Sequence, residues 1–114
     1  MKLIIAIVQP EELPDIKEEL LKRKIYKFTV SSAKGQGREI PVQEVYRGIS
    51  HEISLLTKIR LEIAVNDDYV DQAVEAITVV AKKPDNKGRG KIFVLPIEQC
   101  IRIRTDERGT DAIG

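Results

Sequence analysis

Apolar and polar residues follow one another along the chain in a pattern that predicts strands and helices. Residues 2–8 form a nearly continuous apolar run, which is typical of a strand inside a sheet. Pro10 and Pro14 then mark a helix start, because a helix tolerates proline only in its first turn. The apolar positions of this helix are Leu13, Ile16 and Leu20. Residues 25–33 mix apolar and polar side chains and indicate a second strand.

The second half of the chain repeats this order. Residues 58–65 alternate between apolar and charged side chains, as a strand with one buried face does. Asp67 or Asp68 is expected to cap the helix that follows. The apolar stripe of that helix has a period of about 3.6 residues and consists of Val70, Ala73, Val74, Ile77 and Ala81. Residues 91–95 are a further apolar strand.

Strand, helix and strand therefore occur twice, which gives the order βαββαβ. This order predicts an α+β fold of the ferredoxin-like kind, in which both helices cover one face of an antiparallel sheet. Residues 1–114 make a single domain by length. Because the strands are so apolar, we expect the uncovered face of the sheet to pack against another subunit.

A long segment, residues 35–54, separates the two halves and shows no firm period. Loops of this length are uncommon in compact domains and are often functional. The segment is either a functional loop or a solvated hairpin tip.

Composition and charge narrow the possible functions. Charged residues make up 32% of the 114 residues, and a formal net charge of +1 gives no general attraction to nucleic acid or membrane. The chain has no apolar run long enough to span a membrane and no signal peptide pattern. The single cysteine, Cys100, cannot form an internal disulfide, so we expect a cytoplasmic protein. His51 is the only histidine and has no evident partner, so no enzyme activity is expected.

Two segments carry candidate anion-binding chemistry. In "NKGRGKIFV", Gly88 and Gly90 alternate with Arg89 and Lys91 just before a strand. Glycines allow backbone N–H groups to approach a ligand, and the cations add charge, as phosphate sites require. The spacing differs from that of a P-loop, and a solvated basic turn is the alternative.

The second segment is "IRIRT", which places Arg102 and Arg104 two residues apart. If this segment is extended, both guanidinium groups point to the same side and could grip phosphate. The alternative is an edge strand that uses its charges to avoid aggregation.

The same glycine-rich stretch is also similar to the central signature of RNA-recognition motifs, which share the βαββαβ order. RNA binding in that class requires aromatic rings on the sheet, where bases stack. Here Arg89 and Lys91 occupy the aromatic positions, and aromatic residues are 4% of the chain. The missing aromatic residues therefore argue against RNA binding of this kind. A nucleic-acid-binding module that uses the basic loops is the alternative function.

Over nearly its whole length the chain resembles the PII family of nitrogen regulatory signal-transduction proteins. The resemblance rests on "KGQGR" at 34–38, "YRG" at 46–48, "LTKIRLEIAV" at 56–65, "GRGKIFV" at 88–94 and "IRIRTDERGTDAI" at 101–113. It implies a homotrimer that binds ATP or ADP between subunits, with Mg²⁺ and 2-oxoglutarate as further family ligands. It also implies that the long loop, the T-loop, regulates a partner protein, which in this family can be a membrane transporter, an enzyme or a transcription regulator.

The resemblance assigns roles to particular residues. The nucleotide-binding residues that it implies are Thr29, Gly35, Gly37, Arg38, Ala64, Gly88, Arg89, Gly90, Lys91, Arg102 and Arg104. The two arginines near the C-terminus would reach the nucleotide from the neighbouring subunit. Glu39 and Lys58 take the positions that handle 2-oxoglutarate, and Glu39 is the candidate Mg²⁺ ligand when ATP is bound.

Three departures from the family pattern change the expected response. His51 stands where uridylylated members carry tyrosine. Glu39 replaces the family's glutamine and brings a negative charge beside an incoming dicarboxylate, and Pro41 has no N–H to donate to it. Lys58, the family's partner for the distal carboxylate, is retained. We therefore expect a response mainly to the ATP/ADP ratio, with little sensitivity to 2-oxoglutarate.

Overall fold

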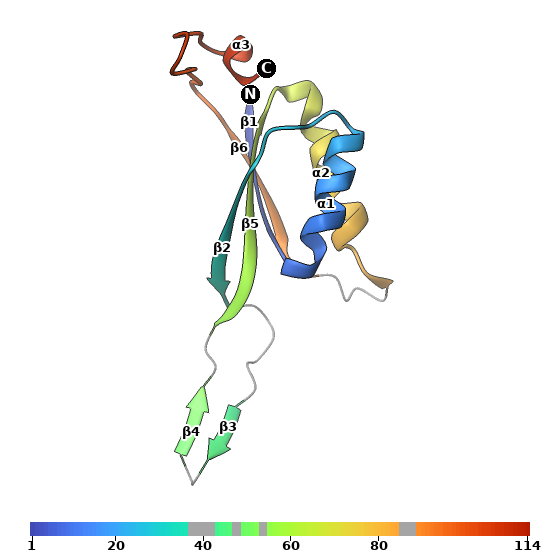
Figure 1. The fold of residues 1–114 in the computed structure, drawn as a ribbon, viewed down its shortest axis with the longest axis vertical. Coiled ribbons are helices and arrows are strands. Elements are labelled where there is room, and N and C mark those ends of the chain that lie inside the picture. The colour runs from blue at the N-terminus through green and yellow to red at the C-terminus, as the bar shows by residue number, and fades with distance from the viewer. Residues whose placement is uncertain (37–42, 47–48, 53–54, 85–88) are drawn as a thin grey trace.

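A four-stranded antiparallel sheet forms the centre of the molecule (Figure 1). The computed structural model describes residues 1–36, 43–46, 49–52, 55–84 and 89–114. The strands of the sheet are β1 (Lys2–Val8), β2 (Thr29–Gly35), β5 (Leu56–Val65) and β6 (Lys91–Pro96). Their order is β2-β5-β1-β6, so a strand of one half separates the two strands of the other. This is the predicted ferredoxin-like arrangement.

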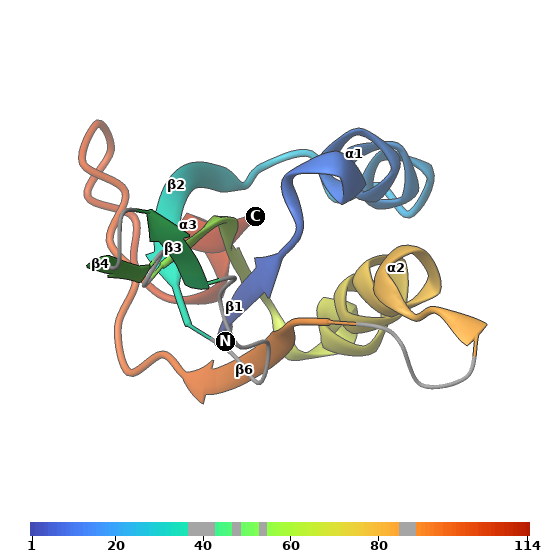
Figure 2. The same ribbon diagram turned by 90° about the horizontal axis from the view of Figure 1, so that it is seen from below.

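Both long helices cover the same face of this sheet, as Figure 2 shows. They are α1 (Leu13–Lys22) and α2 (Val70–Ala81), and each is preceded by a short 3-10 turn, η1 (Pro10–Glu12) or η2 (Asp67–Tyr69). Burying each large aliphatic side chain stabilises the fold by about 1.5–3 kcal/mol. The buried residues are Ile4, Ala6, Val8, Ile16, Leu20, Ile25, Leu61, Ile63, Val65, Ala73, Ala76 and Ile77. No helix in the described ranges has the length and apolar character needed to cross a membrane.

Glu12 connects the start of the first helix with the end of the second. Its side chain is buried, and its Oε1 accepts a hydrogen bond of 2.8 Å from the backbone N–H of Gln9. Its Oε2 lies 3.7 Å from the Nζ of Lys83, just beyond α2. A buried carboxylate needs such partners, and Gln9 and Lys83 supply them to Glu12.

The opposite face of the sheet has no covering layer in the single chain. Leu3, Ile5 and Ile7 of β1 alternate with residues that point into the core, so they point to this face instead. All three are half-buried. On the adjacent strand, 49% of Phe93 and 41% of Leu95 are exposed. The expected open apolar face is therefore present.

The segment between the halves contains a second, two-stranded sheet. Its strands are β3 (Gln43–Tyr46) and β4 (Ile49–Glu52), paired antiparallel with Gln43 opposite Glu52. This hairpin projects beyond the end of β2 and β5 (Figure 1). The sequence did not predict these strands because four-residue strands are too short to show a period.

The second strand begins later than its alternation suggested. Residues 25–28 precede β2, and Ile25 is buried in the core, where its N–H donates to the carbonyl of Leu20 over 2.9 Å. Lys24 has a φ of 62°, so the chain turns sharply at the end of α1. This turn places Ile25 under the helix before the strand starts.

The predicted helix cap at Asp67 or Asp68 is wrong. Asn66 occupies the cap position of η2, and no side chain there bonds to the turn. Asp67 instead accepts a hydrogen bond of 2.8 Å from the amino group of Met1. That bond, together with the charge of Lys2, lowers the pKa of Asp67 below its ordinary value.

Candidate functional site

Gly90 lies against strand β1 at the start of β6. Its φ is 113°, and a Cβ atom at this position would come 2.2 Å from the carbonyl oxygen of Ile7. The residue is therefore required for the close approach of two strands of the same chain. The sequence pattern suggested that both glycines serve a ligand, and the structure shows a packing role for Gly90 that the pattern did not suggest. Gly88 lies outside the described residues.

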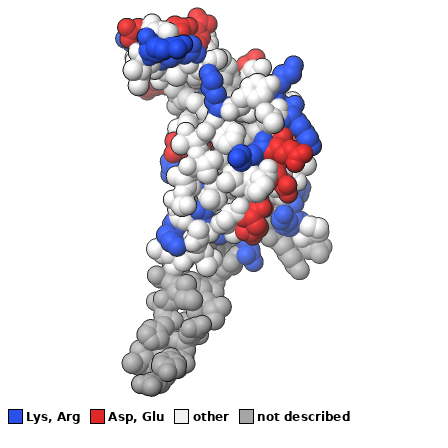
Figure 3. Space-filling model, viewed as in Figure 1, with Lys and Arg blue, Asp and Glu red and all other residues white. Residues whose placement is uncertain are grey.

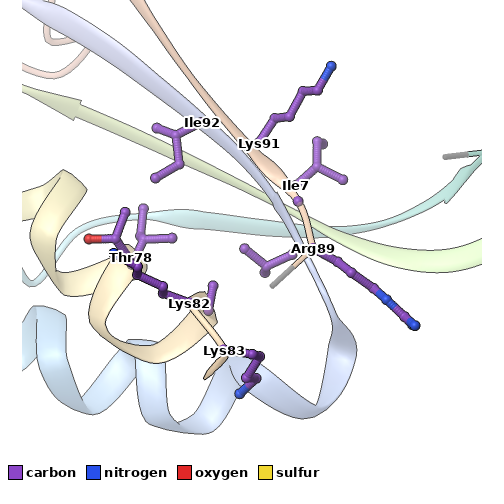
Figure 4. Close-up of a pocket in the computed structure, with 11 residues that line it drawn as sticks. Ile7, Thr78, Lys82, Lys83, Arg89, Lys91 and Ile92 are labelled. Carbon is purple, nitrogen blue, oxygen red and sulfur yellow. The ribbon is translucent and has the colours of Figure 1, made fainter. Parts of the chain in front are cut away.

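A cavity of about 400 Å³ opens between the end of α2 and the start of β6 (Figure 4). Its walls are mostly apolar and include Ile7, Val8, Ile77, Ala81 and Ile92. Basic residues from both elements surround it, namely Lys82, Lys83, Arg89 and Lys91. The side chains of Arg89 and Lys91 diverge from each other (Figure 4). Lys91 pairs with Ile7, so its side chain points to the open face of the sheet, whereas the cavity lies on the helix side.

Lys82, Lys83 and Thr78 were not among the residues predicted to bind a ligand. They line the cavity from the α2 side. The signal for them was the "KK" pair at the end of the apolar stripe, which sequence alone could not place opposite β6. Lys83 is also paired with the buried Glu12, so its position is set by the fold.

The C-terminal segment folds into a tight hairpin followed by the short helix α3 (Thr110–Ile113). Ile101 bridges to Arg108, and the N–H of Arg102 donates to the carbonyl of Glu107 over 2.9 Å. The expectation that Arg102 and Arg104 lie on one side of an extended segment is wrong. Residues 103–105 form a turn, which is followed by Asp106 with a φ of 59°.

The two arginines also differ in their surroundings. The Nη1 of Arg102 lies 3.1 Å from the Oε1 of Glu107, and its side chain is partly buried. Arg104 is exposed, at the turn. The hairpin carries basic and acidic side chains next to each other, at the top of Figure 3.

The predicted anion-binding residues lie at opposite ends of the sheet. Lys91, at the start of β6, pairs with Ile7, whereas Pro96 at the end of β6 pairs with Lys2. The hairpin with Arg102 follows that far end, as Figure 1 shows. At about 3.3 Å per residue, the strand from Lys91 to Pro96 separates the two ends by roughly 17 Å. One chain therefore does not bring Lys91 and Arg102 to one ligand.

The remaining predicted residues divide between these two ends. Gly35 pairs with Leu56 near the T-loop, and a Cβ there would contact Lys58 at 3.5 Å. We call Gly35, Lys58, Arg89, Gly90 and Lys91 the loop-end group. The C-terminal group, at the other end, consists of Thr29, Ala64, Arg102 and Arg104. Gly37, Arg38, Glu39 and Gly88 lie outside the described residues.

Two further polar contacts lie on the sheet near these groups. Lys34 donates from Nζ to the Oγ1 of Thr57 over 2.8 Å, which ties β2 to β5 where the T-loop segment begins. On β5, Arg60 and Glu62 form an ion pair of 2.9 Å. Among the residues that the structure describes, no group of three or more His, Cys, Asp or Glu is arranged to hold a metal ion.

Comparison with known proteins identifies the family. The family described as nitrogen regulatory protein P-II matches residues 1–107 of the chain. The nitrogen regulatory protein GlnK1 of Methanosarcina mazei is 47% identical over 114 residues, which cover 99% of this chain and 97% of that protein. The nitrogen regulatory protein P-II of Cereibacter sphaeroides is 44% identical over 113 residues, covering 99% of this chain and 100% of the relative.

A third relative supports the same assignment. The nitrogen regulatory protein P-II 2 of Methanothermobacter thermautotrophicus is 42% identical over 113 residues, covering 99% of this chain and 97% of that protein. The family match thus identifies the class of protein as a signal-transduction regulator of nitrogen metabolism. The chain belongs to the PII family, as its sequence motifs predicted.

Proposed function

We propose that this protein is a homotrimeric sensor of adenine nucleotides whose binding sites are shared between neighbouring subunits. The observation that carries the proposal is the separation of the loop-end group from the C-terminal group on one sheet. A second copy, placed so that its C-terminal end meets the loop end of the first, would bring Arg102 and Arg104 to the phosphates near Lys91. Neither group alone contains all the residues expected to bind the nucleotide.

Such a contact joins two different surfaces of the same chain. Head-to-tail contacts of this kind close into rings when the rotation permits, and the family resemblance favours a ring of three. The open face of the sheet supplies the apolar surface that a stable assembly needs. Its exposed or half-buried members are Leu3, Ile5, Ile7, Phe93 and Leu95.

The chemistry of the two groups suits a nucleotide. Arginine binds phosphate through two parallel hydrogen bonds, and lysine adds a point charge. Thr29 and Ala64 lie at the same end of the sheet, where a hydroxyl and a small apolar side chain could line the pocket for the base. ADP and ATP both carry a base for such a pocket and phosphates for the basic residues. If Mg²⁺ accompanies ATP, Glu39 is the candidate ligand, and its carboxylate is of the type that Mg²⁺ prefers.

The T-loop is the candidate surface for the regulated partner. Its hairpin, β3 and β4, projects away from the sheet, where a second protein could reach it (Figure 1). The loop begins at Gly35, which belongs to the loop-end group. Nucleotide binding and partner binding are therefore adjacent. The protein itself is cytoplasmic, and its partner is an enzyme, a membrane transporter or a regulator of nitrogen metabolism.

The nucleic-acid alternative has weaker support. Phe93 is the only aromatic residue in the four strands of the main sheet, so the open face offers no row of stacking rings. Isothermal titration of ADP, ATP and a short single-stranded RNA into the protein separates the two functions. Saturable binding of a nucleotide with no binding of RNA supports the proposal, and the reverse result overturns it.

A further inference from the structure

The guanidinium group of Arg102 is occupied by the chain that follows it. Its Nη2 donates to the carbonyl oxygen of Gly114 over 2.7 Å and lies 3.2 Å from the carbonyl of Asp111 and 3.4 Å from that of Ala112. Its Nη1 is paired with Glu107 at 3.1 Å. Both terminal nitrogens, which form the fork that would grip a phosphate, are thus already used.

Several polar contacts attach residues 110–114 to the rest of the chain. Asn66 donates from Nδ2 to the carbonyl of Thr110 over 3.2 Å, and the Nζ of Lys27 lies 3.4 Å from the carbonyl of Gly114. No residue of α3 is fully buried. Segments with few buried apolar contacts open at low free-energy cost. The segment can therefore leave Arg102 without disturbing the core.

We propose that residues 110–114 compete with the bound nucleotide for Arg102. In the free protein the segment holds the guanidinium group by its backbone carbonyls, and a phosphate must displace them to be gripped by the same nitrogens. The ligand is then bound by the fraction of molecules in which the segment is released, so the apparent affinity is lowered by that fraction. This inference rests on the nucleotide site proposed above and adds a means of regulating it.

Release of the segment is also a signal that the rest of the molecule could transmit. The same segment contacts Lys27 through Gly114 and Asn66 through Thr110. Lys27 precedes β2 and Asn66 follows β5, at the end of the sheet away from the T-loop. Nucleotide bound at the loop end of one subunit would thus loosen the C-terminal end of the sheet in the neighbouring subunit, which supplies Arg102.

A proline at residue 112 tests the competition in the full chain. The N–H of Ala112 donates to the carbonyl of Gly109 over 3.0 Å, and Ala112→Pro removes this bond and opens the turn. Ala112→Ser is the matched control, because it keeps the N–H. We expect ADP to bind at least about threefold more tightly to Ala112→Pro, with no gain for Ala112→Ser. The gain should vanish when Arg102→Ala is added, because it acts through that side chain.

Hydrogen exchange gives a second readout on the unmodified protein. The amides of Ala112 and Gly114 should exchange faster when ADP is bound, since the segment is then released. If the unmodified protein binds ADP but Ala112→Pro shows equal or weaker affinity, the competition is wrong and the nucleotide site stands. If neither protein binds ADP or ATP, both the site and its regulation are wrong.

Discussion

Gly90 lies so close to Ile7 that a Cβ atom at residue 90 would come 2.2 Å from the Ile7 carbonyl oxygen. This contact joins the edge strand β6 to β1 at the point where the basic loop ends. Gly90→Ala should therefore destabilise the fold by at least about 2 kcal/mol, because strain at a positive φ adds to a backbone clash. Urea unfolding measures the change.

Gly109→Ala is the control for this prediction. Gly109 also has a positive φ, 75°, but nothing lies within 4 Å of the Cβ that would be added. With a ψ of −141°, Gly109 lies in a region that favours glycine, so its variant should carry only a backbone cost of about 1–3 kcal/mol and should lose less stability than Gly90→Ala. Equal losses for the two variants would show that the contact with Ile7 contributes nothing.

Arg102→Ala should weaken ADP binding by about tenfold or more, since a charge-assisted hydrogen bond contributes roughly 1.5–3 kcal/mol. Arg108→Ala removes the same charge from the same hairpin and lies outside both proposed groups, so its affinity should stay close to that of the unmodified protein. Calorimetry at constant ionic strength compares the three proteins. Similar losses in both variants would point to a general charge effect.

Phe93→Glu should break the assembly. The side chain is 49% exposed on the open face, and the proposed trimer would enclose it. A buried, unpaired carboxylate is strongly unfavourable. Val79→Glu places the same charge at a residue that is 59% exposed on α2, outside the proposed interface. Light scattering should give a mass near 12.9 kDa for Phe93→Glu alone. A trimer in both variants would contradict the interface.

2-Oxoglutarate should bind weakly even when the protein is saturated with Mg²⁺ and ATP. The reasons are the charge of Glu39 and the missing N–H of Pro41, both read from the sequence. The double change Glu39→Gln with Pro41→Gly should strengthen 2-oxoglutarate binding and leave ADP affinity unaltered. Saturable binding of 2-oxoglutarate to the unmodified protein at micromolar levels would refute this prediction.

The sequence predicted the sheet and both helices because their signals are local. Leu61, Ile63 and Val65 alternate with polar residues along β5, and all three are buried. The stripe on α2 likewise placed Ala73 and Ile77 in the core. Periodicity of this kind depends on a few neighbouring residues and so can be read directly.

The candidate site was less predictable because it depends on contacts between distant segments. The role of Gly90 follows from the pairing of β6 with β1, which no local pattern reveals. The partners of Arg102 lie five to twelve residues further along the chain and reach it only through the turn that Asp106 permits. The sequence pattern singled out Arg102 but did not show which groups surround it.

The shared site is tested most directly by mixing two variants, each of which lacks one of the side chains proposed to bind the phosphates. Lys91→Ala and Arg102→Ala, unfolded together in equal amounts and refolded, should recover about a quarter of the high-affinity ADP sites, because each half of a site is filled at random. Each variant refolded alone should recover none. If every site lies within one chain, the mixture also recovers none, because no subunit carries both side chains. That result would contradict the account.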